Sequence, residues 1–165
     1  CRLIYLQTRN SAAYKGVMAL LMKNAKDFIS GSDMNITYFI DENIDIHHIF
    51  PKDYCYKKSL GLQDNKWNSV INKTPLSAKS NRMIGGSAPS IYLDKIEKNM
   101  TSLSNLENNL KSHYISVEDI KNNDFDNYYI KRTKSILKLI ETAMGKPISG
   151  LDSENVIQKY GVTLN

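Results

Sequence analysis

The sequence predicts a mainly helical α+β domain, in which one strand–loop–strand–helix unit is embedded among flanking helices. Apolar residues recur at spacings of three and four over most of the chain, which is the helical pattern. β-Branched and aromatic residues instead concentrate in two short runs, at 44–50 and 70–76. The 165 residues suit one domain over 1–165. The longest apolar run, Val17–Met22, is far shorter than the roughly 18 residues that a membrane span needs, so we expect no membrane partner.

The first half of the chain contains the expected ββα unit, at about residues 44–84. Its elements, with the helix before them, are a helix at 11–30, a strand at 44–50 (IDIHHIF), a long loop with at most one helical turn at 52–68, a strand at 70–76 (VINKTPL) and a short helix at 78–84. Ser11 and Ser77 can cap the two helices, and Gly31 suits the left-handed end of the first. Pro51 ends the first strand.

The second half reads as helices. They are expected to start near Ser87, with Pro89 in the first turn, and to cover 104–113, a short segment after the capping arrangement at 116–119, about 126–144, and 153–160. The apolar face of the 126–144 helix is expected to carry Tyr129, Ile136, Leu139, Ile140 and Ala143. Gly145 and Pro147 end that helix.

The positive charge is concentrated in the middle third of the chain. The formal net charge is +5, and residues 51–100 hold nine Lys and Arg against four Asp and Glu, while the segments on either side are each neutral. A local basic surface attracts polyanions, because each cation that meets a phosphate releases condensed counterions. A solvated Lys-rich loop is the alternative explanation.

The cysteines indicate a reducing compartment. Cys1 and Cys55 can form neither a disulfide framework nor a C-x-x-C metal site. Cys55 has no paired base in the sequence, so a thiol nucleophile is not expected. Because the chain opens with Cys rather than Met, we expect these residues to be a piece of a longer protein.

Two adjacent histidines are the most informative residues. His47 and His48 lie in the first predicted strand, Asn72 lies in the second, and Asn81 follows nine positions later on the short helix. A lone histidine is more often structural, as we expect for His113, which is either structural or exposed. Two together, followed by a proline and a basic loop, favour chemistry, since a neutral imidazole can take a proton from water near pH 7.

Three stretches carry a family resemblance: DIHHIFPK (45–52), INKTPLSAKSNRMIGG (71–86) and APSIYL (88–93). Together they resemble an HNH nuclease of the ββα-metal class, and more narrowly the C-terminal nuclease domain of GmrSD-like restriction proteins, which are bacterial defence proteins that cut foreign DNA. The flanking helices are similar to that subgroup too, so the resemblance covers about 11–147. It implies a DNA endonuclease of the bacterial cytoplasm, with an upstream nucleotide-handling domain outside these residues.

The resemblance implies a role for each residue of the motif. His48 matches the general base, Asn72 the residue that fixes the loop between the strands, and His47 and Asn81 the two metal ligands. One divalent ion is implied, Mg²⁺ first. Because His47 stands where an acidic residue is commoner, Mn²⁺ and Ni²⁺ are also suitable. Asp45 shares the strand face of His47 and can orient it or join the metal shell, although a solvent-facing Asp is an equal alternative.

The geometry of the strand sets one requirement. Adjacent side chains on a strand point to opposite faces, so both histidines can reach one phosphate only if the strand twists or bulges there.

The expected contacts to DNA come from the basic third of the chain. Arg82 is the first candidate for a phosphate contact, followed by Lys73 and Lys79. Trp67 and Tyr54 are aromatic enough to stack on bases, although a loop aromatic more often anchors its loop.

Two other functions stay open. One is a DNA-binding or interaction module with a degenerate HNH frame and no cleavage, which the missing acidic residue at 47 favours. The other is a nuclease that acts on RNA. The intact His48, Asn72 and Asn81 favour the enzyme.

Overall fold

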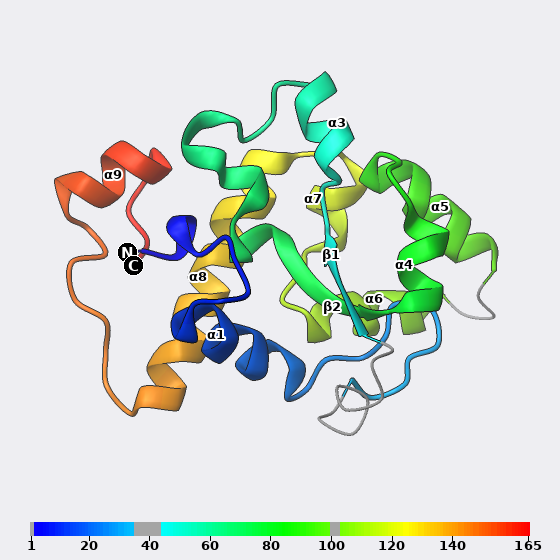
Figure 1. The fold of residues 1–165 in the computed structure, drawn as a ribbon, viewed down its shortest axis with the longest axis horizontal. Helices are drawn as coiled ribbons and strands as arrows, with labels where there is room; N and C mark the ends of the chain where they lie inside the picture. The colour runs from blue at the N-terminus through cyan, green and yellow to red at the C-terminus, as the bar shows by residue number, and fades with distance from the viewer. Residues whose placement is uncertain (1, 35–43, 100–102) are drawn as a thin grey trace.

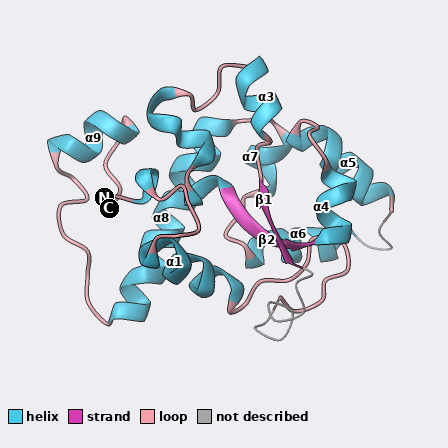
Figure 2. Cartoon of the chain, viewed as in Figure 1, coloured by secondary structure: helices cyan, strands magenta, loops and turns pink. Residues whose placement is uncertain are grey.

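A computed structural model describes residues 2–34, 44–99 and 103–165 of the chain (Figure 1). The structure is mainly helical with a small two-stranded antiparallel sheet, so the expected α+β class is confirmed (Figure 2). The strands are β1 (Ile44–His48) and β2 (Lys73–Ser77), and the helices are α1 (Ala12–Met22), α3 (Lys52–Lys57), α4 (Ala78–Ile84), α5 (Pro89–Lys98), α6 (Leu103–Ser112), α7 (Val117–Lys121), α8 (Phe125–Met144) and α9 (Glu154–Tyr160). In this part of the chain, no helix has both the length and the apolar character that crossing a bilayer requires.

The two strands form a hairpin that α4 follows without a break. β1 pairs with β2 in one continuous register, which runs from Ile44 opposite Ser77 to His48 opposite Lys73. Ser77 caps α4 as expected, because its side chain accepts a hydrogen bond from the Ser80 backbone N–H at 3.1 Å. Helix α4 packs against both strands, and α1 packs against β2 (Figure 1). The local arrangement is therefore two strands and a helix at 44–48 and 73–84.

Helix α1 ends earlier than its apolar pattern predicts. The expected helix at 11–30 stops at Met22, and Asp27 organises the residues that follow. The Asp27 carboxylate accepts hydrogen bonds from the backbone N–H of Ile29 and Ser30, and also from the Ser77 N–H and the Ser80 hydroxyl. Contacts with the start of α4 thus override the local helical propensity, and these contacts lie too far along the chain for a local pattern to show them.

The segment between the strands is more ordered than the expected loop. Helix α3 takes up its first six residues, and a 3-10 segment covers Gln63–Asn68. Between them Gly61 has φ +59°, and a Cβ there would lie 2.5 Å from Cζ of Phe125. The second strand also starts later than predicted, because Val70–Asn72 form a 3-10 turn.

Helix α8 is the longest helix described, and it packs against α1, α7 and the 3-10 turn at 70–72. Tyr129 and Ile136 are buried, as predicted, and Leu139 and Ile140 are half-buried. Ala143 was expected on this face but is exposed, because the last turn of α8 leads into the exposed segment 142–147.

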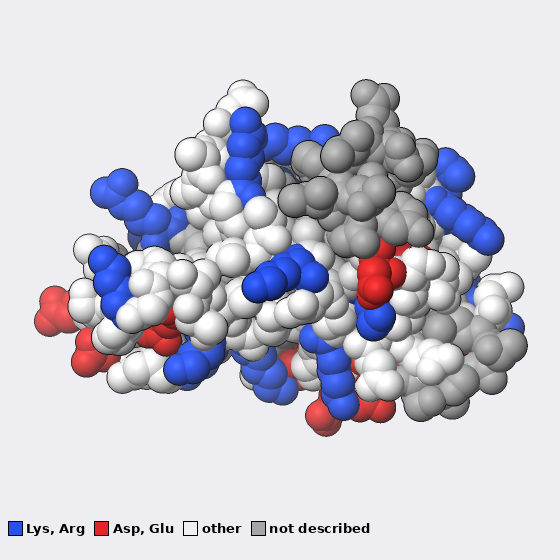
Figure 3. Space-filling model, turned by 90° about the horizontal axis from the view of Figure 1, so that it is seen from below, with Lys and Arg blue, Asp and Glu red and all other residues white. Residues whose placement is uncertain are grey.

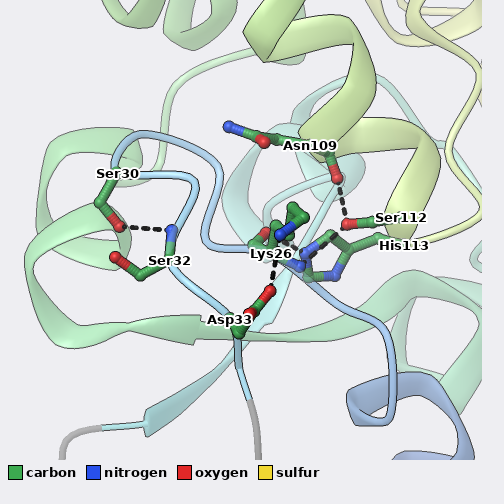
Figure 4. A network of polar contacts seen from close by, with 7 residues as sticks. All are labelled: Lys26, Ser30, Ser32, Asp33, Asn109, Ser112 and His113. Atoms are coloured by element: carbon green, nitrogen blue, oxygen red, sulfur yellow. Dashed lines mark hydrogen bonds and ion pairs between the residues drawn. The ribbon is translucent and has the colours of Figure 1, made fainter.

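His113 is a buried structural residue, and its ring lies beside Lys26 (Figure 4). The Thr74 hydroxyl contacts its Nδ1 at 2.6 Å, and its Nε2 contacts the Lys26 carbonyl at 2.6 Å. A carbonyl can only accept, so Nε2 carries the proton and Nδ1 accepts from Thr74. His113 therefore joins β2 to the turn after α1 in its neutral form.

We expect His113 to make stability depend on pH. Burial lowers the pKa of His113 to about 4, whereas an unfolded chain binds the proton near pH 6.5. The unfolded state therefore binds more protons as pH falls, and the free energy of unfolding should drop by about 2 kcal/mol from this residue between pH 7 and pH 5. Urea unfolding at both pH values should show a smaller drop in His113→Gln than in the parent chain. Equal drops would contradict a neutral buried ring.

Candidate functional site

His47, Asn81 and Asp45 form a chain of hydrogen bonds between β1 and α4. His47 Nδ1 lies 2.8 Å from Asn81 Oδ1, and Asn81 Nδ2 donates to Asp45 Oδ2 at 3.0 Å. Because Asp45 accepts from the amide nitrogen, the amide oxygen of Asn81 faces the His47 ring. Asp45 thus orients Asn81 rather than His47, which is a different partner from the one expected.

The His47–Asn81 pair has the spacing of two adjacent metal ligands. Ligands about 2.1 Å from an octahedral ion stand about 3.0 Å apart at neighbouring positions, close to the 2.8 Å found here. Burial lowers the pKa of His47 to about 4, so the ring is neutral at pH 7, and a neutral imidazole is the form that binds metals. Its Nε2 is buried without a hydrogen-bond partner among the described residues. Since the Asn81 oxygen can only accept, Nδ1 carries the proton in this structure, and the ring would bind an ion there only after that proton has moved to Nε2. With that tautomer, the two atoms fit the first two ligands of a divalent ion.

The pair is not completed by further strong ligands. Across residues 2–34, 44–99 and 103–165, no three side chains from His, Cys, Asp and Glu come together as a metal-binding group. An ion held by His47 and Asn81 would therefore take its remaining ligands from water or from a phosphate.

His48 stands at the end of β1 with one ring nitrogen engaged. Its Nε2 lies 3.2 Å from Asn68 Oδ1, and its ring is tilted against Trp67 with centroids 5.5 Å apart. Since an amide oxygen accepts, Nε2 carries the proton and Nδ1 is left as the nitrogen that can take one. Burial lowers the pKa of His48 below its usual range, and the charges of Lys73 and Lys52 act in the same direction. The ring is therefore neutral at pH 7, as a base must be.

The two histidines have different partners, and the expected bulge is absent from β1. The register is unbroken from Ile44 to His48, so the side chains of His47 and His48 leave opposite faces of the strand. His47 meets α4, whereas His48 meets the 3-10 segment that ends at Asn68. Without a bulge, the two rings could serve one phosphate only through the twist of the strand.

Asn72 fastens the two chain segments that leave the hairpin. Its side chain accepts from the Phe50 N–H at 2.9 Å and donates to the carbonyls of Phe50 at 2.9 Å and Trp67 at 2.7 Å. The Ile49 N–H also donates to the Asn72 carbonyl at 2.9 Å. Asn72 is fully buried, so it holds the segments that follow His48 and precede β2 without facing a substrate.

Three side chains that the sequence did not single out hold the backbone around Asn72. We name Tyr92, Tyr128 and Arg132 the backbone clamp. Tyr92 Oη donates to the Ile49 carbonyl at 2.9 Å, and Tyr128 Oη donates to the Ile71 carbonyl at 3.0 Å.

Arg132 makes the most contacts in the clamp. Nη1 donates to the carbonyls of Ile71 and of Lys73, the latter at 2.9 Å, and Nε donates to the His113 carbonyl at 3.1 Å. It is 1% exposed, and no ion pair to it is found in the described part of the chain. Carbonyl dipoles therefore replace a carboxylate around this charge. An arginine on an otherwise regular amphipathic helix carries no sequence signal for such a role.

The predicted cations separate into two groups. Lys79 and Arg82 are exposed on α4, next to Asn81, and are free to face a phosphate. Lys73 is buried, and its Nζ donates to the Gln7 carbonyl at 2.7 Å. This burial argues against the expected phosphate contact, and Lys73 instead joins β2 to the N-terminal segment.

On one face of the molecule, the basic residues do not form a compact patch. On the face seen in Figure 3, Lys and Arg side chains are spread out, with Asp and Glu between and beside them. This face of the molecule therefore carries both signs of charge.

The aromatic residues of the loop follow the anchoring alternative rather than base stacking. Trp67 is 8% exposed and anchors the loop, as the alternative reading had it, and Tyr54 is half-buried with its ring 6.4 Å from that of Phe50. Tyr56, which no motif includes, is the exposed ring of this segment.

A separate cavity of about 500 Å³ lies between the turn after α1 and α6. It is lined by Lys26, residues 29–31 and the asparagines 99, 105, 108 and 109, and it shares no residue with the histidine site.

The comparisons with known proteins give one relative. The uncharacterized protein MJ0686 of Methanocaldococcus jannaschii is 33% identical over 122 residues, which cover 68% of this chain and 20% of that protein. The chain thus spans about a fifth of the length of its curated relative. No family model matches the chain, and no solved structure does.

Proposed function

We propose that the chain is a divalent-metal-dependent endonuclease of the HNH (ββα-metal) class that hydrolyses DNA phosphodiester bonds in bacterial restriction and anti-phage defence. The observation that carries the proposal is the pairing of His47 Nδ1 with Asn81 Oδ1 at 2.8 Å, beside a second neutral histidine at the end of the same strand. The resemblance adds an upstream nucleotide-handling domain as a partner.

In this proposal each side chain has one task. His47 and Asn81 hold the ion, with Asp45 keeping the Asn81 oxygen turned towards it. When bound, a divalent ion stabilises the charge that develops on the phosphate and on the leaving 3′-oxygen. His48 takes a proton from the attacking water at Nδ1, while Asn68 holds the opposite nitrogen and fixes the tautomer. Lys79 and Arg82 bind flanking phosphates, and Asn72 keeps the frame rigid.

The small number of protein ligands favours a second candidate. Two ligands without a carboxylate hold Mg²⁺ weakly, and a DNA-binding module without cleavage would show the same frame. Cleavage distinguishes the DNA nuclease from the non-cleaving DNA-binding module. An RNA substrate of the same length tests the third function, a nuclease that acts on RNA.

We expect the purified chain to nick supercoiled plasmid in Mg²⁺ or Mn²⁺ and to lose this activity in EDTA. The reason is that, without the ion, nothing in the proposed site stabilises the charge that develops on the phosphate. Gel electrophoresis of the plasmid over time, with Ni²⁺ and a single-stranded RNA as parallel arms, measures the rate. Nicking that persists in EDTA would overturn the metal site. Binding of the plasmid without nicking in any metal would leave the non-cleaving module.

A further inference from the structure

An exposed aromatic ring, that of Tyr56, is connected to His48 through one intervening side chain, Trp67. Tyr56 on α3 is 52% exposed, and its ring packs edge-on against Trp67 with centroids 5.5 Å apart and planes at 64°. Trp67 also meets the His48 ring, again with centroids 5.5 Å apart. Trp67 therefore joins the proposed catalytic base to a ring that faces solvent.

A cation accompanies this ring. Lys52 Nζ lies 5.9 Å from the Tyr56 centroid and 5.8 Å from the Trp67 centroid. Lys52 has no carboxylate partner among the ion pairs of the described residues. We call Lys52, Tyr56 and Trp67 the aromatic platform.

The platform is fastened to the rest of the fold. Helix α3 begins immediately after Pro51, and only three residues separate it from the end of β1. The following turn passes so close to Phe125 at Gly61 that a Cβ would not fit there. The Trp67 carbonyl accepts from Asn72. A rigid ring at a fixed position can bind a flat partner without losing much side-chain freedom.

A second exposed tyrosine, Tyr5, differs from Tyr56 in its surroundings. Tyr5 is 53% exposed and also has a lysine over its ring, Lys159, at 5.8 Å. However, Lys159 pairs with Asp64 at 2.9 Å, so its charge is already neutralised. Tyr5 also shows no ring contact with either site histidine among the described aromatic pairs. An exposed ring, an unpaired cation and contact with the base through Trp67 occur together at Tyr56.

We propose that the aromatic platform stacks one unpaired nucleobase of a DNA strand next to the phosphodiester that is attacked by the water that His48 activates. This inference rests on the proposed nuclease function. The Tyr56 ring takes the face of the base, and Lys52 takes the adjacent phosphate. In a blunt duplex both faces of an internal base are already stacked, so the platform favours single-stranded or distorted DNA.

The test measures binding without cleavage, in EDTA, by fluorescence anisotropy. The probes are a labelled 15-mer of thymidine, a 15-mer of the same length made of abasic sites, and a blunt 15-base-pair duplex. We expect Tyr56→Ala to weaken binding of the thymidine probe by about 5- to 150-fold, the range for one lost base–aromatic stack, and to change the other two less than twofold. Tyr56→Phe should retain the binding, because it keeps the ring.

The matched control is Tyr5→Ala, which removes an equally exposed tyrosine with a lysine over it. An unchanged affinity in this variant, beside a loss in Tyr56→Ala, supports the platform. The proposal is overturned if Tyr56→Ala leaves the thymidine affinity unchanged, if all three probes weaken equally, or if both alanine variants lose the same affinity. Because no cleavage is measured, a chain that binds through the platform but does not nick plasmid contradicts the nuclease alone.

Discussion

Replacing His48 by Ala should slow metal-dependent nicking of plasmid by about 10²–10⁴-fold, the usual cost of removing a general base. The loss is expected in the rate at saturating DNA, because the proposed role of His48 is on the attacking water rather than on the phosphates. Asn68→Ala should cause a smaller loss, since the ring remains but nothing holds Nε2 and the tautomer is free to change. Initial nicking rates at several DNA concentrations would separate rate from affinity.

The controls for His48→Ala are its fold and its binding. Circular dichroism should stay native, because His48 is only partly buried at the edge of the hairpin. Binding of the duplex in EDTA should stay within twofold of the parent chain. A variant that is folded, binds DNA and nicks at the parent rate would exclude His48 as the base.

Replacing Arg132 by Met should lower the free energy of unfolding by about 2–4 kcal/mol. The change removes charged hydrogen bonds to the carbonyls of Ile71, Lys73 and His113, each normally worth more than a neutral one. Relief from burying the charge offsets part of this loss. Urea unfolding followed by circular dichroism gives the difference directly.

Arg82→Met is the matched control for Arg132→Met, because it makes the same change at an exposed position on α4. Its effect should stay within about 0.5 kcal/mol, as for most surface substitutions. If both variants lowered the free energy of unfolding equally, the hydrogen bonds of Arg132 in the backbone clamp would not contribute to stability.

The sequence predicted the elements whose signals are local. The short helix after Ser77 and the helix that begins at Pro89 start where their capping residue and proline indicated. The first helix ended early because Asp27 binds the start of α4, 50 residues further on, and no local pattern contains that contact. The second strand started late because Asn72 uses its side chain to hold Phe50, which suits a turn better than a strand.

The candidate site was predictable only in part, for the same reason. The spacing from His47 to Asn81 brought those two residues together as expected, because a hairpin followed directly by a helix leaves few other arrangements. Asn68 and the backbone clamp were missed. An asparagine in a polar loop and an arginine on an amphipathic helix are common, and only the folded chain shows that one holds His48 and the other holds three carbonyls.

The backbone clamp also sets an order of assembly during protein synthesis. Tyr128 and Arg132 lie 57 and 61 positions after Ile71, the residue whose carbonyl both of them hold. A ribosome releases the chain from its N-terminus, so the hairpin and α4 emerge well before α8 exists. Until then the turn before β2 lacks the donors that hold it, and the segments carrying His48 and Asn81 have no fixed frame. In the proposed nuclease, the two histidines and Asn81 would therefore gain their fixed frame only after α8 has left the ribosome.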